Sequence, residues 1–249
     1  MPQDLFDLTG KVAVVTGGAG LLGRRFAEAL LAAGAIVETI DGRPTRAKMS
    51  NWVIDITDRD KLGLVLDRIA GPDCLDILVN AAAINPQPAD VQMPFEDYPL
   101  DAWQKSLDVN LTGTMLCCQA AGRIMRKQGH GVIVNIASTY GMVAPDQRIY
   151  GKGNFKPADY CVGKAGVIQL TRYLAAYWGG TGIRVNCLSP GGVANGQDAE
   201  FVKNYADCVP MGRMAEPDEL CGALLFLCSD ASSYMTGANL VVDGGWTAW

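Results

Sequence analysis

Residues 11–23 read KVAVVTGGAGLLG, and this stretch decides the fold. Its Val-rich half, 11–16, is typical of a buried β-strand. Its Gly-rich half, 16–23, leads into a segment whose apolar residues recur at helical spacing until Gly34. Glycines between a strand and a helix let the backbone turn sharply and approach a pyrophosphate, which the free N–H groups at the start of the helix can bind. The stretch therefore predicts a strand–turn–helix unit that binds a dinucleotide.

The rest of the chain alternates short apolar runs with helical patterns. The expected strands are residues 11–16, 36–40, 52–54, 75–80, 131–137, 183–188 and 238–242. After the first helix, the expected helices are about 58–70, 101–127, 159–178 and 216–228. Strands joined by helical crossovers predict an α/β fold, a doubly wound, seven-stranded parallel sheet with helices on both faces. No repeat or linker divides the pattern, so we expect residues 1–249 to form a single domain.

The composition narrows the possible partners. The formal net charge is −5 and the Lys and Arg residues are scattered, which argues against nucleic acid as a partner. No apolar run reaches the roughly 18 residues of a membrane span. The N-terminal stretch MPQDLFDLTG lacks the basic and apolar regions of a signal peptide. We therefore expect a cytoplasmic protein that binds neither membrane nor nucleic acid.

Candidate metal ligands are few. The eight cysteines form no CxxC motif, and most lie in apolar runs, where a free thiol behaves as a small hydrophobic group. His130 is the only histidine and stands in a turn, KQGHG. Zinc sites are built from several Cys and His ligands at set spacings. We therefore expect no metal site.

Asp41 follows the second expected strand, 18 residues after Gly23 (41 − 23). A carboxylate at this place can accept hydrogen bonds from the hydroxyls of the adenosine ribose, and it would repel a 2′-phosphate. Arg43, two residues further on, could instead accommodate that phosphate. We expect NAD as the cofactor, with NADP as the less favoured alternative.

Tyr160 and Lys164 are four residues apart in a helical pattern, DYCVGKAGVIQLTRYL, so both lie on one face. A free phenol has a pKa near about 10 and is a poor base at neutral pH. A nearby ammonium group stabilises the phenolate and lowers that pKa by about 1–3 units. Tyr160 could then exchange a proton with an alcohol or a carbonyl compound near neutral pH.

With this pair, the sequence resembles the short-chain dehydrogenase/reductase family over nearly its whole length. The motifs that carry the resemblance occur in the family's order: the turn at 16–23, Asp55 in DIT, NAAA at 80–83, Asn110 in DVN, Ser138, Tyr160 with Lys164, Pro190-Gly191, and VVDGG at 241–245. The resemblance implies a Rossmann-type fold and hydride transfer between a nicotinamide cofactor and a carbon that bears a hydroxyl or carbonyl group. It also implies a homotetramer or homodimer.

The resemblance further implies roles for individual residues. Tyr160 would be the general acid/base, and Lys164 would lower its pKa and bind the nicotinamide ribose. Ser138 would hydrogen-bond the reacting oxygen, and Asn110 would hold a water that links Lys164 to solvent. The cofactor would contact Gly17, Gly20, Leu22, Gly23, Asp41, Asp55, Ile56, Asn80, Ala81, Ala82, Tyr160, Lys164, Pro190, Gly191, Gly192 and Val193.

Three features depart from the family pattern. Leu21 stands where the family has a glycine, so the glycines fall at 17, 20 and 23, a spacing similar to that of the longer epimerase/dehydratase branch. The threonine common after Pro190-Gly191 is replaced by Asn195 or lost. Ser138 and Tyr160 are 22 positions apart (160 − 138), more than is usual, so 140–159 is an enlarged loop.

The leading interpretation is therefore an NAD(P)-dependent oxidoreductase that acts on a secondary alcohol or ketone. The glycine spacing keeps open an epimerase or dehydratase of sugar derivatives that retains its NAD. A non-catalytic dinucleotide-binding scaffold is the third alternative, although the complete set of catalytic residues argues against it.

The enlarged loop is where we expect substrate identity to be decided. Its many polar residues favour a polar or sugar-like substrate over a hydrophobic one, unless they form solvated surface. The candidate substrate contacts are Asn85, Ser138, Gln147, Arg148 and Tyr150, with Gln87 as a further polar group at the same edge. Two tryptophans, Trp246 and Trp249, end the chain, and we expect them to be buried against a neighbouring subunit or over a pocket.

Overall fold

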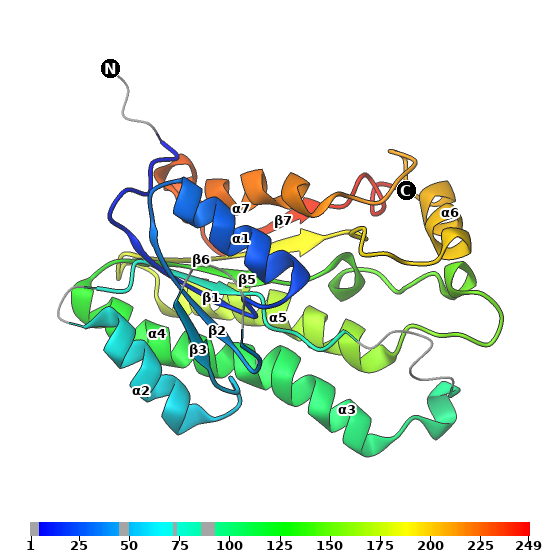
Figure 1. Ribbon diagram of the computed structural model, residues 1–249, viewed down its shortest axis with the longest axis horizontal. Coiled ribbons are helices and arrows are strands. Elements are labelled where there is room, and N and C mark those ends of the chain that lie inside the picture. The colour runs from blue at the N-terminus through cyan, green and yellow to red at the C-terminus, as the bar shows by residue number, and fades with distance from the viewer. Residues whose placement is uncertain (1–4, 45–49, 72–73, 86–92) are drawn as a thin grey trace.

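The structure, a computed structural model, describes residues 5–44, 50–71, 74–85 and 93–249. Its centre is one sheet of seven parallel strands in the order β3-β2-β1-β4-β5-β6-β7 (Figure 1). The strands are β1 (Val12–Thr16), β2 (Ile36–Asp41), β3 (Ser50–Val53), β4 (Ile77–Asn80), β5 (Gly131–Ile136), β6 (Ile183–Pro190) and β7 (Asn239–Val242). The strand order reverses between β1 and β4, which makes this the point at which open α/β sheets bind ligands. The predicted fold is confirmed.

Helices cover both faces of the sheet (Figure 1). One face carries α1 (Leu21–Ala32) and α7 (Cys221–Cys228), and the other carries α2 (Arg59–Ala70), α4 (Thr114–Gln128) and α5 (Ala158–Tyr177). Side chains of β1 alternate between the two layers, because Ala13 and Val15 lie in the first core and Val14 lies in the second. Burial on both faces is the reason that β1 is a continuous apolar run.

The expected helix 101–127 is interrupted. It consists of α3 (Leu100–Leu107), a π-helical turn at Asp108–Gly113, and α4. A π-turn holds one residue more than an α-turn, and such insertions are frequent at functional sites. In this turn the side chain of Asn110 is fully buried.

Helix α6 (Ala199–Asp207) was not predicted from the sequence. It begins after Asp198, whose carboxylate accepts a hydrogen bond from the Phe201 N–H, as an N-cap residue should. Phe201 and Tyr205, four residues apart, form its apolar side, but the helix has only nine residues, and so short a pattern is a weak signal in a sequence.

Short 3-10 turns complete the described secondary structure, at Phe95–Asp97, Thr139–Gly141, Gln147–Tyr150, Pro217–Leu220 and Asp230–Ser232. Two of them, Thr139–Gly141 and Gln147–Tyr150, lie in the enlarged loop between β5 and α5. The turn at Pro217–Leu220 takes up the first part of the expected helix 216–228, so only the remainder forms α7. Within the described ranges, no helix combines the length and the apolar character that a membrane crossing requires.

Candidate active site

The glycine-rich turn after β1 is built on close contacts that exclude side chains. A Cβ atom on Gly17 would lie 2.7 Å from Ala82, one on Gly18 would lie 2.5 Å from Thr39, and one on Gly23 would lie 2.1 Å from the Gly17 carbonyl oxygen. Gly17 also has a φ of +73°, which favours glycine. The turn therefore needs glycine at three of its positions for its own packing.

Helix α1 starts directly after this turn. Its N-cap, Gly20, supplies no side-chain hydrogen bond, and its first turn contains no acidic residue. The first N–H groups of the helix are thus available to a bound anion such as a pyrophosphate. Leu21 takes the first helical position, where a glycine is not required, and Leu22 follows it. The substitution at position 21 therefore leaves the turn and the helix start intact.

Asp41 ends β2 beside the turn. One of its carboxylate oxygens accepts a hydrogen bond from the Ala19 N–H at 3.0 Å, and the other accepts one from the Arg43 N–H at 2.9 Å. The Arg43 side chain is mostly exposed, and its Nε lies 3.7 Å from Asp41. A carboxylate has about four acceptor positions, so Asp41 can still accept hydrogen bonds from ribose hydroxyls. These features of the turn and of Asp41 fit a dinucleotide.

The other residues expected near adenosine lie at the ends of β3 and β4. Asp55 is exposed, and its Oδ1 accepts hydrogen bonds from the N–H and the hydroxyl of Thr57. Ile56 is buried against Gly113 of the π-helical turn. Asn80 donates to the Asn135 Oδ1 at 2.8 Å and so links β4 to β5. Ala81 and Ala82 follow Asn80, and the Ala82 N–H donates to the Thr16 hydroxyl at 3.2 Å.

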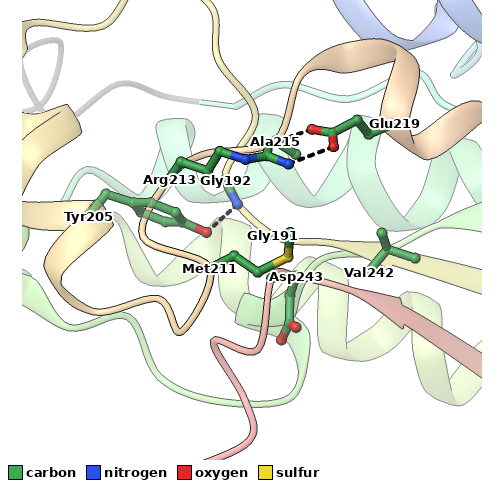
Figure 2. Close-up of a pocket in the computed structure, with 10 residues that line it drawn as sticks. Gly191, Gly192, Tyr205, Met211, Arg213, Ala215, Glu219, Val242 and Asp243 are labelled. Carbon is green, nitrogen blue, oxygen red and sulfur yellow. Dashed lines mark hydrogen bonds and ion pairs between the residues drawn. The ribbon is translucent and has the colours of Figure 1, made fainter.

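The segment Pro190–Val193 leaves the end of β6 and is held from both sides. The Gly191 N–H donates to the Val242 carbonyl oxygen, and the Gly192 carbonyl oxygen accepts from the Ala215 N–H. Figure 2 shows the small cavity of about 70 Å³ beside it, where the Tyr205 hydroxyl accepts a hydrogen bond from the Gly192 N–H. A Cβ atom on Gly192 would lie 2.5 Å from the Tyr205 ring. Helix α6 is thereby fastened to the predicted nicotinamide-side segment.

Tyr160, Lys164 and Ser138 come together at the carboxyl end of β5. Ser138 follows β5, and its Oγ accepts a hydrogen bond from the Tyr140 N–H. Gly141 allows this turn to rest on α5, because a Cβ atom there would lie 2.7 Å from the backbone of Lys164. The Lys164 Nζ donates to the Ile136 carbonyl oxygen at 2.6 Å and lies 5.7 Å from the centroid of the Tyr160 ring.

Burial opposes the expected lowering of the Tyr160 pKa. Burial raises the pKa of Tyr160 to about 12, and a hydrogen bond with Ser138 only partly opposes this effect. Burial also lowers the pKa of Lys164 to about 8. Desolvation disfavours a charge on either group, and it is the largest cause of both shifts. Positive charge near the Tyr160 hydroxyl would favour the phenolate form that acts as a base.

The side-chain amide of Asn110 links two segments of the chain. Its Nδ2 donates to the Ile84 carbonyl oxygen at 2.9 Å, and its Oδ1 accepts from the Ile84 N–H at 2.8 Å. It also donates to the Ser106 hydroxyl, and it faces Gly163, the neighbour of Lys164 in α5. Asn110 thus ties the segment after β4 to the catalytic helix. Its predicted contact with a bridging water stays a prediction.

The predicted substrate contacts occupy different surroundings. Arg148 points to solvent and pairs with Asp146 at 2.6 Å. The Tyr150 hydroxyl lies 2.7 Å from the Tyr140 hydroxyl. Asn85 and Gln147, in contrast, both contact one residue that the sequence analysis did not select, Lys156. Gln87 lies outside the described residues.

Lys156 lies close to the Tyr160 ring, as Lys164 does. Its Nζ is 4.4 Å from the centroid of the Tyr160 ring and contacts the Asn85 Oδ1. The only signal in the sequence was its spacing, four residues before Tyr160, which mirrors the position of Lys164.

The tail of the chain joins an aromatic cluster, formed by Tyr140, Tyr150, Phe201, Tyr205 and Trp246. The Trp246 ring stacks on Tyr205 at 4.8 Å and meets Tyr140 edge-on at 6.3 Å. Trp246 is only 9% exposed, so the expected burial is present, but the residues that cover it belong to its own chain. Trp249 is 81% exposed in this single chain.

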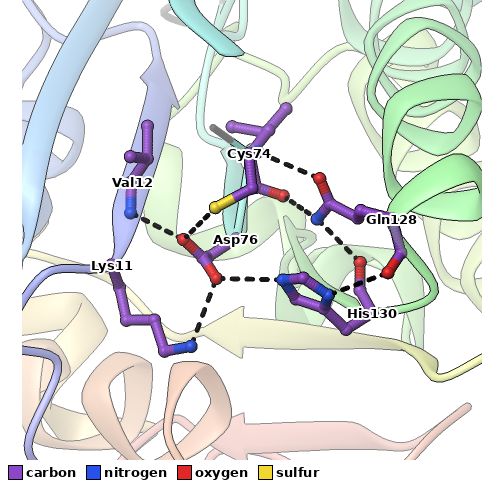
Figure 3. A network of polar contacts seen from close by, with 7 residues as sticks. Lys11, Val12, Cys74, Asp76, Gln128 and His130 are labelled. Carbon is purple, nitrogen blue, oxygen red and sulfur yellow. Dashed lines mark hydrogen bonds and ion pairs between the residues drawn. The ribbon is translucent and has the colours of Figure 1, made fainter. Parts of the chain in front are cut away.

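His130 belongs to a polar network at the opposite edge of the sheet (Figure 3). Cys74, Asp76 and His130 bring three potential metal-ligand atoms within 4.8 Å of one another. The Asp76 carboxylate already accepts hydrogen bonds from the Lys11 ammonium and the Val12 N–H. We interpret the network as a junction between the starts of β1, β4 and β5. The cysteine spacing did not predict it, because the three side chains meet only in the folded chain.

Comparisons with known proteins match the chain over almost its full length. A family profile described as enoyl-(acyl carrier protein) reductase matches residues 17–247. D-Threitol dehydrogenase of Mycolicibacterium smegmatis is 36% identical, over 97% of this chain and 95% of that protein. Cis-4-hydroxycyclohexanecarboxylate dehydrogenase of Sinomonas cyclohexanicum is also 36% identical, over 96% of this chain and 97% of that protein.

A solved structure gives the same result. The crystal structure of a short chain dehydrogenase from Leptospira borgpetersenii with bound NAD+ matches with a TM-score of 0.90 and 36% identity, over 99% of this chain and 96% of that one. Sequence, fold and the Ser138/Tyr160/Lys164 arrangement thus lead to one assignment. The chain belongs to the short-chain dehydrogenase/reductase family, a family of NAD(P)-dependent oxidoreductases.

Proposed function

We propose that this protein is an NAD-dependent dehydrogenase that oxidises a secondary hydroxyl group of a small polar molecule, a polyol or a sugar derivative. The observation that carries the proposal is the convergence of Ser138, Tyr160 and Lys164 at the carboxyl edge of a sheet whose first turn fits a dinucleotide. The similarity to a D-threitol dehydrogenase supports a hydroxylated substrate.

The roles of the residues follow from their chemistry. Ser138 Oγ would hold the reacting oxygen, and Tyr160 Oη would take the hydroxyl proton during oxidation or return it during reduction. When bound, NAD would accept the hydride that leaves the carbinol carbon, which becomes a carbonyl carbon. Lys164, 5.7 Å from the Tyr160 ring, would supply the positive charge that stabilises the phenolate.

The preference for NAD rests on Asp41. Its nearly buried carboxylate is held beside the glycine turn by two backbone N–H groups, so it cannot easily move away from a 2′-phosphate. A 2′-phosphate next to this carboxylate would be repelled, because like charges repel more strongly at a partly buried site than in bulk water.

We also propose that the protein assembles with copies of itself. Tyr173 and Tyr177 stack on each other on the outer side of α5, and each is 61% exposed. Val162, on the same helix, is exposed as well, and β7 forms an edge of the sheet. Exposed apolar groups gathered on one element are typical of an interface. Such a pair of surfaces would suit a homodimer or a homotetramer.

Eight free cysteines support a reducing compartment, so we place the protein in the cytoplasm. Cell fractionation with an antibody would test this, and recovery of the protein from an oxidising compartment would contradict it.

The decisive experiment is a substrate panel. Purified protein is incubated with NAD+ or NADP+ and with polyols, sugars, sugar acids and hydrophobic secondary alcohols, and the absorbance of the reduced cofactor is followed. We expect net NADH formation with hydroxylated substrates. Tyr160→Phe should lower kcat by about 10²–10⁴-fold, whereas Tyr173→Phe, a conservative change on the same helix, should not. Turnover of hydrophobic alcohols alone would contradict the substrate class. Conversion of a sugar without net NADH would indicate an epimerase or dehydratase.

A further inference from the structure

A pocket of about 340 Å³ opens near the start of α5, the helix that carries Tyr160. It lies between the segments 93–98 and 155–158 and includes Gln147 of the enlarged loop. Met93, Phe95 and Phe155 give it largely apolar walls, and its charged lining residues are Glu96 and Lys156. The volume is at the lower end of the range for small-molecule sites, so the pocket suits a compact ligand.

Lys156 connects this pocket to the reacting groups. It lines the pocket, and its Nζ lies 4.4 Å from the centroid of the Tyr160 ring. Lys156 thus both lines the pocket and packs on the ring of the catalytic tyrosine, so a ligand in the pocket would lie next to an ammonium group. Sites of this kind use a few placed polar groups within apolar walls to fix the orientation of the ligand.

The position of Lys156 is fixed by its surroundings. Gln147 holds its backbone at both ends, because the Lys156 N–H donates to the Gln147 Oε1 at 2.8 Å and the Gln147 Nε2 donates to the Lys156 carbonyl oxygen at 3.1 Å. The Nζ contacts the Asn85 Oδ1, and the residue is only 7% exposed. Little side-chain entropy would be lost when such a group binds a ligand. This also gives Gln147 and Asn85, both predicted substrate contacts, a positioning role.

The charge of Lys156 is poorly solvated. Burial lowers the pKa of its ammonium group to about 8, while the nearby Asp159 and Cys161 act in the opposite direction. Asp159 is itself fully buried at the start of α5. A pKa of about 8 leaves most of the ammonium protonated at pH 7. Attraction between opposite charges is much stronger in such a site than in water.

We propose that Lys156 binds a carboxylate group of the substrate, so that the enzyme acts on a hydroxy acid, such as a sugar acid, in preference to a neutral polyol. This proposal rests on the proposed dehydrogenase function and names its substrate class. The carboxylate is not changed in the reaction. It anchors one end of the molecule at Lys156 while a hydroxyl group at another carbon meets Ser138 and Tyr160.

The test compares matched acids and neutral compounds. The pairs are D-gluconate with D-glucitol, and 4-hydroxycyclohexanecarboxylate with its carboxamide; D-glucitol 6-phosphate serves as a second anion. For the wild-type enzyme, kcat/KM should be at least about 10-fold higher for an acid than for its neutral partner, as a charge-assisted hydrogen bond would provide. Lys156→Met should remove that preference, and Lys156→Arg should keep part of it. Lys152→Met, which removes an exposed lysine of the same loop, should change nothing.

The outcomes separate a recognition role from a structural one. If Lys156→Met lowers kcat/KM equally for acids and neutral compounds, Lys156 is structural and the proposal is overturned. Turnover of the phosphate but not of the acids would also overturn it. If no compound reduces the cofactor, the dehydrogenase proposal fails, and calorimetric titration with D-gluconate decides the second proposal independently. Binding by the wild type that is weakened at least about 10-fold in Lys156→Met supports it, and equal or absent binding overturns it.

Discussion

Tyr160 has two lysines near its ring, with the Lys156 Nζ 4.4 Å and the Lys164 Nζ 5.7 Å from the ring centroid. Both ammonium groups are buried and have a lowered pKa, because a desolvated charge is unfavourable. The same burial raises the pKa of the Tyr160 phenol. At the scale of residues, burial therefore governs the protonation of all three groups.

The first prediction concerns Lys164 and pH. Its pKa is about 8 in the folded protein, against 10.5 for a lysine in an unfolded chain. Between these values the unfolded chain binds more protons, so the contribution of Lys164 to stability rises with pH through this window. Lys164→Met removes the buried charge and should stabilise the protein most below pH 8. That advantage should shrink as the pH approaches 10.5.

Urea denaturation at several pH values would measure this difference between the variant and the wild type. Lys152→Met is the control, and it should stay close to wild type at each pH. A Lys164→Met difference that is constant from pH 7 to 10 would show that Lys164 carries no buried charge.

The second prediction concerns cofactor choice. Asp41→Asn keeps a hydrogen-bond acceptor for the Ala19 N–H but removes the charge that opposes a 2′-phosphate. We expect the ratio of kcat/KM with NADP to that with NAD to rise by about 10-fold or more, which corresponds to about 1.4 kcal/mol. Asp67→Asn, on the exposed side of α2, should leave the ratio unchanged. An unaltered ratio in Asp41→Asn would mean that Asp41 does not discriminate between the cofactors.

At the scale of elements, the helices and loops beyond the strand ends are held by a few specific contacts. The π-helical turn places Asn110 on the backbone of Ile84, and Gly141 lets the turn after β5 rest on α5. Helix α6 packs through Phe201 and Tyr205, and Tyr205 contacts both Gly192 and Trp246. Its position therefore depends on the tail of the chain.

The third prediction follows from this dependence. Trp246→Ala removes the ring that stacks on Tyr205 and should lower the free energy of unfolding by about 2–4 kcal/mol, as other large-to-small changes in a core do. Because Tyr205 accepts from the Gly192 N–H, the affinity for NAD should fall as well. Urea denaturation and fluorescence titration with NADH would measure the two effects. Trp249→Ala, an exposed site, should change stability by less than about 0.5 kcal/mol. Equal effects of the two variants would contradict the packing role of Trp246.

At the scale of the whole molecule, one sheet organises every site. The glycine turn follows β1, the catalytic serine follows β5, and the segment Pro190–Val193 follows β6, so all three lie at the carboxyl edge. The network of Cys74, Asp76 and His130 lies at the opposite edge and joins the starts of three strands. The carboxyl ends of the strands thus carry the candidate active site, whereas their amino ends carry a structural network.

The fourth prediction concerns assembly. Size-exclusion chromatography with light scattering should show a dimer or a tetramer for the wild type. Substitution of both Tyr173 and Tyr177 by Glu places charges on the exposed stack of α5 and should produce a smaller species with an unchanged circular dichroism spectrum. Leu64→Glu, an exposed position on α2, is the matched control and should not alter assembly. A monomeric wild type would contradict the interface.

Local patterns in the sequence were sufficient to predict the sheet, the glycine turn and the Tyr160/Lys164 pair. Strand and helix periodicities depend on neighbours within a few residues, and the i, i+4 spacing puts two side chains on one face of a helix without reference to the rest of the chain. Asp41 and Ser138 could be placed as well, because parallel strands bring the residues that follow them to one edge. These features are encoded within short segments.

Only the tertiary structure decided the features that depend on distant residues. The high pKa of Tyr160 results from burial by segments far apart in the chain, and desolvation cannot be read from spacing. Lys156 contacts Asn85, which is 71 positions away in the sequence, and it lines the pocket; both contacts exist only in the folded chain. Helix α6 is held through its Tyr205, which stacks on Trp246 from the end of the chain. The sequence alone thus determined the fold and the reaction chemistry, whereas packing decided the charges and contacts that surround the substrate.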